Sequence, residues 1–454
     1  LRLPMLGVHT VAAGGGSLLV FDGSRLLVGP ASAGSLPGPR CDRRGGPLTG
    51  TDANLMTGRL QADCFPAVFG PQGNQHLDVE AARLGFKTLA EEVNAALACN
   101  YSPEQLAEGF LDIAIENMAN AIRHMTLARG VNPAGFTLVG FGGAGGQHAC
   151  AVAGRLGIAS ILISPYASVL SAFGIGLAER RQLQLTAIEL ELCQALAGPL
   201  TELHNGVPGS DEQTMQRRAL LHYAGADSTL AIPLADAKTM RAAFEAAHRA
   251  RFGFADPDRD LICSALETEF IAEGGAASPR APEAEMPATP FDRRPVFIAG
   301  RWQDTALYAR DALSRDQSIP GPALIVEPGS TLLVEPGWTA RMTARGDLLL
   351  TSGAARSLRP DPGRADPTWL TLFNRRFMSL AEDMGRILQN TARSVNIRER
   401  LDFSCAVFDQ AGNLVANAPH IPVHLGSMGD SVRGIASRFA GEMRPGNAYL
   451  INSP

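Results

Sequence analysis

Residues 137–157, TLVGFGGAGGQHACAVAGRLG, decide the fold class of this chain. An apolar run leads into a loop with five glycines in seven residues, and small apolar residues follow at helical spacing. The pattern predicts a strand at 136–141, a loop at 142–146, a helix at about 147–156 and a strand at 158–164. Such a βαβ unit is typical of the α/β class.

A glycine loop between a strand and a helix gathers backbone N–H groups at a helix N-terminus, which favours an anion. The alternative is a tight turn that packs the strand against the helix and binds nothing. Gly140-x-Gly142-x-x-Gly145 matches a dinucleotide fingerprint, but residues 158–172 lack the acidic ribose ligand of that fold. A P-loop is excluded because Lys and Ser or Thr do not follow the last glycine.

The nucleotide site that fits best uses two glycine loops, AAGGGS at 12–17 and FGGAGG at 141–146. In an ATP site of the actin or hexokinase kind, set between two lobes, the first loop would wrap the phosphates and the second would cover the nucleoside. The residues expected to contact ATP are Gly14, Gly15, Gly16, Ser17, Gly142, Gly143, Ala144, Gly145, Gly146 and Gln147.

Composition narrows the class of protein. The 454 residues suggest about three domains, and 45% hydrophobic against 19% charged residues is typical of a globular protein. A net charge of -5 argues against nucleic-acid binding, and no apolar run reaches the ~18 residues of a membrane span. Seven cysteines, without a CxxC pair, indicate reduced thiols and no metal-ligating set. With a poor signal peptide at the N-terminus, these features predict a cytoplasmic protein without nucleic-acid or membrane partners.

Turn and capping signals divide the chain further. Asp22-Gly23 predicts a hairpin after strands at 8–13 and 17–21, and Ser102, Pro103 and Gln105 predict a capped helix start. Residues 291–350 alternate short strands with Pro-Gly turns, which predicts a small all-β unit. Helix returns from Trp369, a strand-turn-strand follows, and the chain stops after a further strand.

Several long segments resemble the hydantoinase A/oxoprolinase and hydantoinase B family. The hydantoinase A resemblance rests on GVHTVAAGGGSLLVFDGSRLLVGPASAGSLPGPRC, GGPLTGTDANLMTGRL, FGGAGGQHAC and GPALIVEPGSTLLVEPGW. The start of hydantoinase B is similar to NRRFMSLAEDMGRILQNTARSVNIRERLDFSCAVFD and NLVANAPHIPVHLGSMGDSV. The two parts fused in this order resemble ATP-dependent 5-oxoprolinases, and the resemblance covers nearly the whole chain.

The resemblance implies an α/β fold with several parts. Residues 1–275 would be the C-terminal lobe of an actin/hexokinase-like ATPase fold, and 287–350 the small all-β domain. A linker at 351–366 would lead to 367–454, the truncated start of a hydantoinase B α/β domain. We expect the chain to be an internal fragment of a longer protein and, because it carries one lobe only, to be inactive by itself.

The implied activity is ATP-dependent hydrolysis of 5-oxo-L-proline to L-glutamate, with Mg²⁺ accompanying ATP. Alternatives within the same resemblance are an N-methylhydantoinase and an acetone-carboxylase-type component. The expected partner is a small cyclic amide substrate, and the full-length protein is expected to be a homo-oligomer. A chain that folds partly and catalyses nothing is a third, non-enzymatic hypothesis.

Some polar residues are candidates for catalysis or substrate binding. Asp52, in TDANL, could orient a substrate, although an Asp at a helix start often serves as a cap. His420 and His424 lie four residues apart in a proline-containing segment that could enter an active site. Arg398 and Arg400 could bind a substrate carboxylate, although such a charge run usually forms a solvated face. Cys150 is expected to be a core residue.

Overall fold

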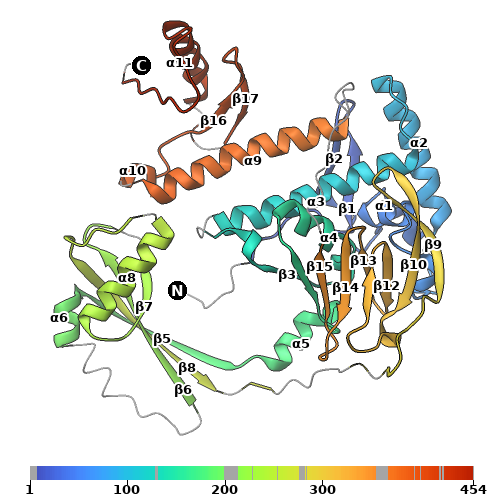
Figure 1. Ribbon diagram of the computed structural model, residues 1–454, viewed down its shortest axis with the longest axis horizontal. Coiled ribbons are helices and arrows are strands. Elements are labelled where there is room, and N and C mark those ends of the chain that lie inside the picture. Colours follow the sequence, from blue (N-terminus) through green and yellow to red (C-terminus); the bar gives the residue numbers. More distant parts are fainter. Residues whose placement is uncertain are drawn as a thin grey trace.

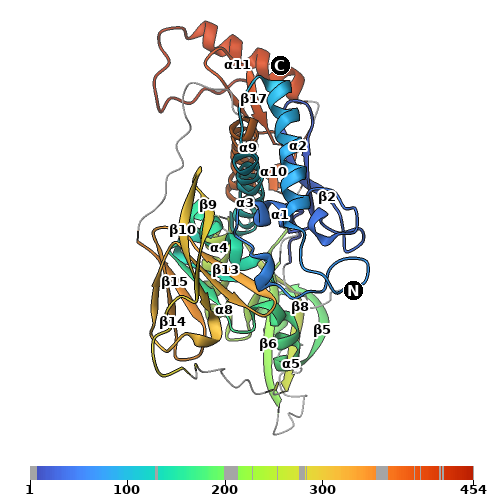
Figure 2. The same ribbon diagram turned by 90° about the vertical axis from the view of Figure 1, so that its right-hand side faces the viewer.

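The computed structural model, drawn in Figures 1 and 2, describes residues 8–127, 131–198, 213–226, 229–252, 254–272, 274–275, 282, 284–353, 367–392, 394–398, 400–418, 421 and 424–452. The predicted hairpin is confirmed as β1 (Ser17–Phe21) paired with β2 (Leu26–Ser32). Asp22 closes its turn by accepting the backbone N–H groups of Ser24 and Arg25 at 3.0 and 2.7 Å. The strand expected at 8–13 is wrong, because residues 8–16 form no strand.

Helices α1 (Gly50–Met56), α2 (Val79–Leu97) and α3 (Pro103–Leu127) pack beside this hairpin. The predicted capping box at the start of α3 is confirmed: Ser102 N donates to Gln105 Oε1 at 2.9 Å, and Gln105 N donates to Ser102 Oγ at 3.2 Å. Short 3-10 helices η1 (Arg40–Asp42), η2 (Ala62–Cys64) and η3 (Pro133–Gly135) occupy the connections. Helices α1, α2 and α3 therefore pack against the hairpin that follows the first glycine loop.

The βαβ unit is confirmed. Strand β3 (Thr137–Gly140) leads through the glycine loop into α4 (Gly145–Leu156), and β4 (Ser160–Ile163) pairs in parallel with β3. The other neighbour of β4 is distant in the sequence: β15 (Leu348–Ser352) pairs antiparallel with β4. The described strands of this sheet have the order β11-β14-β15-β4-β3.

The strands of the segment expected to be a small all-β unit are shared between two sheets, one of which also contains β3 and β4. Strands β11 (Ser318–Pro320), β14 (Trp338–Met342) and β15 extend the βαβ sheet. Strands β9 (Asp292–Ile298), β10 (Arg301–Ala309), β12 (Ala323–Glu327) and β13 (Ser330–Val334) form a second sheet, ordered β13-β12-β10-β9, with η5 (Arg310–Ala312) after β10. Apolar side chains of α4, β4, β13 and β15 share one core. The division expected between residues 1–275 and 287–350 stays a prediction.

Between β4 and β9 the chain forms a further α/β part, seen at the lower left of Figure 1. After η4 (Ala167–Val169) and α5 (Leu170–Leu177), the described elements are β5 (Arg180–Glu191), α6 (Leu192–Ala197), β6 (Gln213–Tyr223), β7 (Leu230–Pro233), α8 (Ala237–Phe252) and β8 (Leu261–Ala272). The strand order is β5-β8-β6-β7. Phe244 and Tyr223 meet edge to face in a core distinct from that of the βαβ sheet.

The C-terminal part begins with α9 (Pro367–Thr391), which lies along α3 in both views. It continues through α10 (Val395–Arg398), the hairpin of β16 (Ala406–Phe408) and β17 (Leu414–Asn417), and α11 (Leu425–Arg438). The strand expected at the very end is wrong, since residues 447–452 form none. Residues 354–366, most of the expected linker, lie outside the described part.

Candidate active site

The second glycine loop leads directly into the N-terminus of α4. Ala144 stands at the N-cap position and provides no side-chain hydrogen bond to the helix. Gly142 has a φ of +84°, a backbone conformation that residues other than glycine rarely adopt. A helix N-terminus without a capping side chain keeps N–H groups available to an anion, so the local geometry fits the nucleotide prediction.

The glycines of this loop have two different surroundings. A Cβ atom added at Gly145 would meet no heavy atom within 4 Å, and the same holds at Gly142. At Gly146, in contrast, a Cβ would lie 2.9 Å from Thr331 O in β13. Gly146 is therefore required for close packing of α4 on β13, whereas the space beside Gly145 is open to a ligand.

The first glycine loop is held by its carbonyl groups. Gly15 O accepts the Thr51 N–H at 2.8 Å, and Gly16 O accepts the Ala33 N–H at 2.9 Å. A Cβ at Gly15 would lie 2.8 Å from Thr51 Oγ1. These contacts dock the loop onto the start of α1 and the end of β2, and Ser17 is buried. The predicted contact of Gly14, Gly15, Gly16 and Ser17 with phosphate stays a prediction.

A buried polar cluster joins the helices that follow the two loops. Asn54 of α1 has its Nδ2 atom 3.4 Å from His148 Nε2 in the first turn of α4. The side chains of Asn54, Arg59 and His148 are 1%, 4% and 8% exposed. Asn54 Oδ1, His148 Nδ1 and two guanidinium nitrogens of Arg59 have no hydrogen-bond partner among the described residues. Unpaired buried polar atoms are rare in folded proteins, which makes this cluster a functional candidate.

All three residues lie in the motifs TDANLMTGRL and GGQHAC, but no pattern in the sequence predicted that they would meet. The available signal was the presence of polar side chains inside otherwise apolar helical segments. Burial, followed by the charge of Arg59, lowers the pKa of His148 from 6.5 to about 3. His148 is thus a neutral imidazole at ordinary pH, which can accept or donate a hydrogen bond without carrying charge.

Asp52 has the geometry of a structural carboxylate. It is fully buried, and its two oxygens accept hydrogen bonds from Thr49 N, Thr49 Oγ1, Arg40 N and Cys41 N at 2.8–3.2 Å. These bonds cap α1 and tie the 40–41 segment to it. Asp52 therefore fills the capping role that was the alternative for this residue, and a role in orienting a substrate stays a prediction.

The other predicted residues lie in the C-terminal part. His424 precedes α11, and its Nδ1 atom is 3.0 Å from Ser404 Oγ. His420 lies outside the described residues, so the pairing of the two histidines stays a prediction. The Arg398 guanidinium stands 5.7 Å from the centre of the Phe254 ring, and Arg400 is exposed. In both views α9 separates the β16–β17 hairpin and α11 from α4, so these residues do not join the glycine loops.

Cys150 lies in the core shared by α4 and the βαβ sheet. Cys150 is 2% exposed and its thiol contacts Leu333 O at 3.4 Å, which confirms the predicted core position. Burial raises the pKa of this thiol, so it is a poor nucleophile. The described residues contain no group of three His, Cys, Asp or Glu side chains that could hold a metal ion. None of the helices in the described ranges is both long and apolar enough to cross a membrane.

Comparison with known proteins identifies the family. Residues 1–184 match Hydantoinase/oxoprolinase, residues 276–346 match Hydantoinase/oxoprolinase C-terminal domain, and residues 366–454 match Hydantoinase B/oxoprolinase. The whole chain aligns at 37% identity with the 5-oxoprolinase of Saccharomyces cerevisiae. The chain belongs to the hydantoinase/oxoprolinase family. It spans 38% of the length of that relative.

Solved structures place the hydantoinase/oxoprolinase chain in the expected α/β fold class. The crystal structure of ATP-dependent caprolactamase from Pseudomonas jessenii matches with a TM-score of 0.63 at 31% identity, over 78% of this chain and 54% of that one. A nucleotide-free acetone carboxylase matches with a TM-score of 0.56 at 20% identity, over 75% of this chain and 52% of that one, a likeness in fold alone.

Proposed function

We propose that the protein containing this hydantoinase/oxoprolinase chain hydrolyses a cyclic amide at the expense of ATP, converting 5-oxo-L-proline to L-glutamate. One observation carries the proposal: an uncapped helix N-terminus after an open glycine loop lies in a chain that aligns along its whole length with a 5-oxoprolinase. A dehydrogenase is disfavoured because no acidic residue follows in 158–172.

The chemistry requires ATP because a lactam is a poor electrophile. The lactam oxygen attacks the γ-phosphorus, ADP leaves, and an imidoyl phosphate forms. Water then adds to the activated carbon, and the C–N bond breaks as the ring nitrogen takes a proton. A second water hydrolyses the resulting acyl phosphate, which releases phosphate and the amino acid. In this proposal the N–H groups around Gly145 bind phosphate oxygens, and α4 supplies its positive end.

Mg²⁺ would enter with ATP. Magnesium in such sites is held largely by substrate phosphates and a few waters, so it does not need a protein cage. The described residues assemble no three-residue metal set, and we therefore derive no step through the ion. A cytoplasmic location and a homo-oligomeric state remain proposals. The first rests on seven cysteines without a disulfide.

The deciding experiment is a coupled assay on the complete protein encoded by the gene. ADP and phosphate are expected to appear in step with glutamate when 5-oxoproline is added. Caprolactam and hydantoins serve as comparison substrates and would define the lactam specificity. If bicarbonate and a ketone stimulate ATP turnover and 5-oxoproline does not, the hydrolase assignment is wrong and a carboxylase replaces it.

A further inference from the structure

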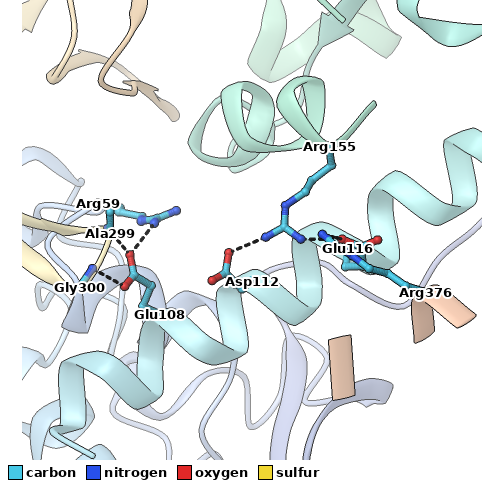
Figure 3. A network of polar contacts seen from close by, with 8 residues as sticks. All are labelled: Arg59, Glu108, Asp112, Glu116, Arg155, Ala299, Gly300 and Arg376. Atoms are coloured by element: carbon cyan, nitrogen blue, oxygen red, sulfur yellow. Dashed lines mark hydrogen bonds and ion pairs between the residues drawn. The ribbon is translucent and has the colours of Figure 1, made fainter. Parts of the chain in front are cut away.

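One face of α3 carries a row of acidic residues that contacts four other segments, one of them the turn at Ala299 and Gly300 (Figure 3). Glu108, Asp112 and Glu116 are spaced four residues apart, so they lie on one side of the helix. Like charges at this spacing repel unless cations neutralise them. The cations come from elsewhere: Arg59 follows α1, Arg155 lies in the last turn of α4, and Arg376 belongs to α9.

Glu116 is the member of this row that contacts arginines of two other helices, α4 and α9. Its Oε2 atom lies 2.6 Å from Arg155 Nη1 and 3.5 Å from Arg376 Nη2. The Glu116 side chain is 2% exposed, and those of Arg155 and Arg376 are 10% and 38% exposed. The first contact is short and buried, whereas the second is long and half-open. The contact to α9 is therefore the one that can tighten or loosen at small cost.

On one side, Glu116 connects to the glycine loop through α4. This helix begins at Gly145, beside the proposed phosphate site, and Arg155 stands one residue before its end. A single α-helix of this length moves as a nearly rigid rod of about 18 Å. If an anion at its N-terminus shifts α4, Arg155 moves with the helix relative to Glu116.

On the other side, Arg376 connects to the C-terminal part through α9. Ala381 of α9 is fully buried together with Phe403 and Cys405. Between those two residues, Ser404 places its hydroxyl 3.0 Å from His424 Nδ1. The packed path from the glycine loop to His424 thus runs through α4, Glu116 and α9.

A cavity of about 370 Å³ lies beside the shared carboxylate. Its lining is Glu116, Arg123, Arg155, Arg376, Ser379, Leu380 and Asp383. The three arginines face two carboxylates in the lining and Asp112 behind it, so the cavity carries no excess positive charge for an anion. The space instead leaves room for the Arg376 side chain to change its position.

We infer that Glu116 is a positioning residue that transmits the nucleotide state of α4 to α9. When nucleotide orders the start of α4, Arg155 sets the Glu116 carboxylate, and Arg376 closes onto it. The inference rests on the proposed function in one respect: the nucleotide is ATP and the event on the α9 side is ring opening. The contact between Glu116 and Arg376 lies outside both the glycine loop and the segment that carries His424.

The first test measures hydrogen exchange along α9 in the complete protein, with and without ATP. Addition of ATP is expected to slow exchange in 376–388 about two- to tenfold. Arg376→Gln should abolish this change while ATP still binds. Glu80→Gln, in an exposed i,i+3 pair with Arg83, is the matched control and should leave the ATP effect intact. Equal protection of α9 in Arg376→Gln and wild type would overturn the inference.

The second test measures the number of ATP molecules consumed per 5-oxoproline opened. A merely structural defect lowers the rates of ATP hydrolysis and of 5-oxoproline opening together, because it reduces only the amount of active enzyme. The ratio of the two rates then stays unchanged. Loss of positioning raises the ratio about two- to tenfold. Glu116→Gln and Arg376→Gln should do so to the same extent, and the double variant should be no worse than either single one. Glu116→Asp, which keeps the charge, should recover part of the coupling.

The two proposals fail in different ways. If the wild-type protein shows no 5-oxoproline-dependent ATP hydrolysis, the proposed function is wrong, and the exchange experiment still decides the role of Glu116. If the wild type turns over 5-oxoproline and both variants keep its ratio and its exchange pattern, only the positioning role is wrong. Arg376 is half-exposed, so Arg376→Gln is expected to fold even if Glu116→Gln does not.

Discussion

The two glycine loops look alike in sequence and differ in what surrounds them. The 14–16 loop uses its carbonyl groups, which accept hydrogen bonds from Thr51, Ala33 and Ser17. The 142–146 loop ends at a helix N-terminus without a capping side chain. A Cβ would clash with Thr51 at Gly15 and would meet nothing at Gly145. Glycine thus serves packing at Gly15 and Gly16 of the first loop, whereas the space beside Gly14 and Gly145 is open.

A glycine can be required for packing against protein or for access of a ligand to the backbone, and the sequence alone does not distinguish the two. Where the neighbour is protein, substitution should lower the stability of the fold. Where the neighbour is open space, substitution should lower ligand affinity and leave stability nearly unchanged. The following experiments test the two loops and the buried polar residues beside them, beginning with the largest expected effect.

The support under the first loop should depend most strongly on Asp52. Asp52→Asn replaces a buried oxygen that accepts hydrogen bonds with an NH₂ group facing N–H and O–H donors. We expect a loss of about 3 kcal/mol in the free energy of unfolding, measured by urea denaturation. ATP affinity of the folded fraction should stay within twofold. A stable Asp52→Asn protein with impaired turnover would instead support a role for Asp52 in orienting a substrate.

The second loop should respond in affinity. Gly145→Val puts a branched side chain where N–H groups are proposed to meet phosphate, so Kd for ATP should rise about tenfold to a hundredfold. Isothermal titration calorimetry provides the measurement, and thermal unfolding should shift by only a few degrees. Gly146→Ala is the matched control within the same loop, because its Cβ faces Thr331 O and should cost stability. Unchanged ATP affinity in folded Gly145→Val would place the nucleotide elsewhere.

The buried cluster between the loops should make stability depend on pH. The pKa of His148 is about 3 in the folded protein and near 6.5 when unfolded. Between these values the unfolded chain binds a proton that the folded chain does not, so stability is lost as pH falls from 6.5 toward 3. His148→Gln should flatten this decline by up to about 1.4 kcal/mol per pH unit.

The measurement is the urea midpoint at a series of pH values from 7 down to 4. His76→Gln, which changes an exposed histidine, serves as the control and should keep the wild-type slope. If the slopes of wild type and His148→Gln coincide, His148 is already protonated or exposed in the native protein, and the proposed burial of a neutral imidazole is wrong.

The smallest effect is expected in the first loop itself. Gly15→Ala places a Cβ 2.8 Å from Thr51 Oγ1, which should cost about 1 kcal/mol of stability. Thr51→Ala in the same chain removes the clash and should recover part of that loss. ATP affinity is the discriminating measurement. A tenfold loss of affinity in Gly15→Ala, beyond the change in stability, would put the 14–16 loop in contact with phosphate as the sequence predicts.

Local signals predicted much of the fold. The Asp22-Gly23 hairpin, the Ser102–Gln105 capping box and the βαβ unit depend on residues close together in sequence, and each is confirmed. The partner of β4 could not be found in this way, because β15 follows about 190 residues later and its short apolar strand has many possible neighbours. The expected strand at 8–13 failed because apolar residues alone do not supply a pairing partner.

The candidate site was predictable in its loops and not in its centre. Glycine spacing identifies the 142–146 loop, but which glycines face protein depends on β13, which the sequence does not place. Asn54 and His148 are separated by more than ninety residues and meet only after α1 and α4 pack on α3. Asp52 illustrates the opposite case, since a carboxylate in a motif proved to be a cap. The sequence shows which residue types are present but not which distant residues come into contact.

The strand order β11-β14-β15-β4-β3 also constrains how the chain folds during synthesis. Strands β3 and β4 leave the ribosome long before β15, and at ~5–20 residues per second the interval is about 10–40 s. Over that interval β4 lacks one neighbour, while the β5–β8 part can complete its own sheet. Such non-local pairing slows folding and leaves an unpaired strand edge open to other chains. Recombinant yield should therefore depend on translation speed and chaperones before residue 352 more than on any property of the finished site.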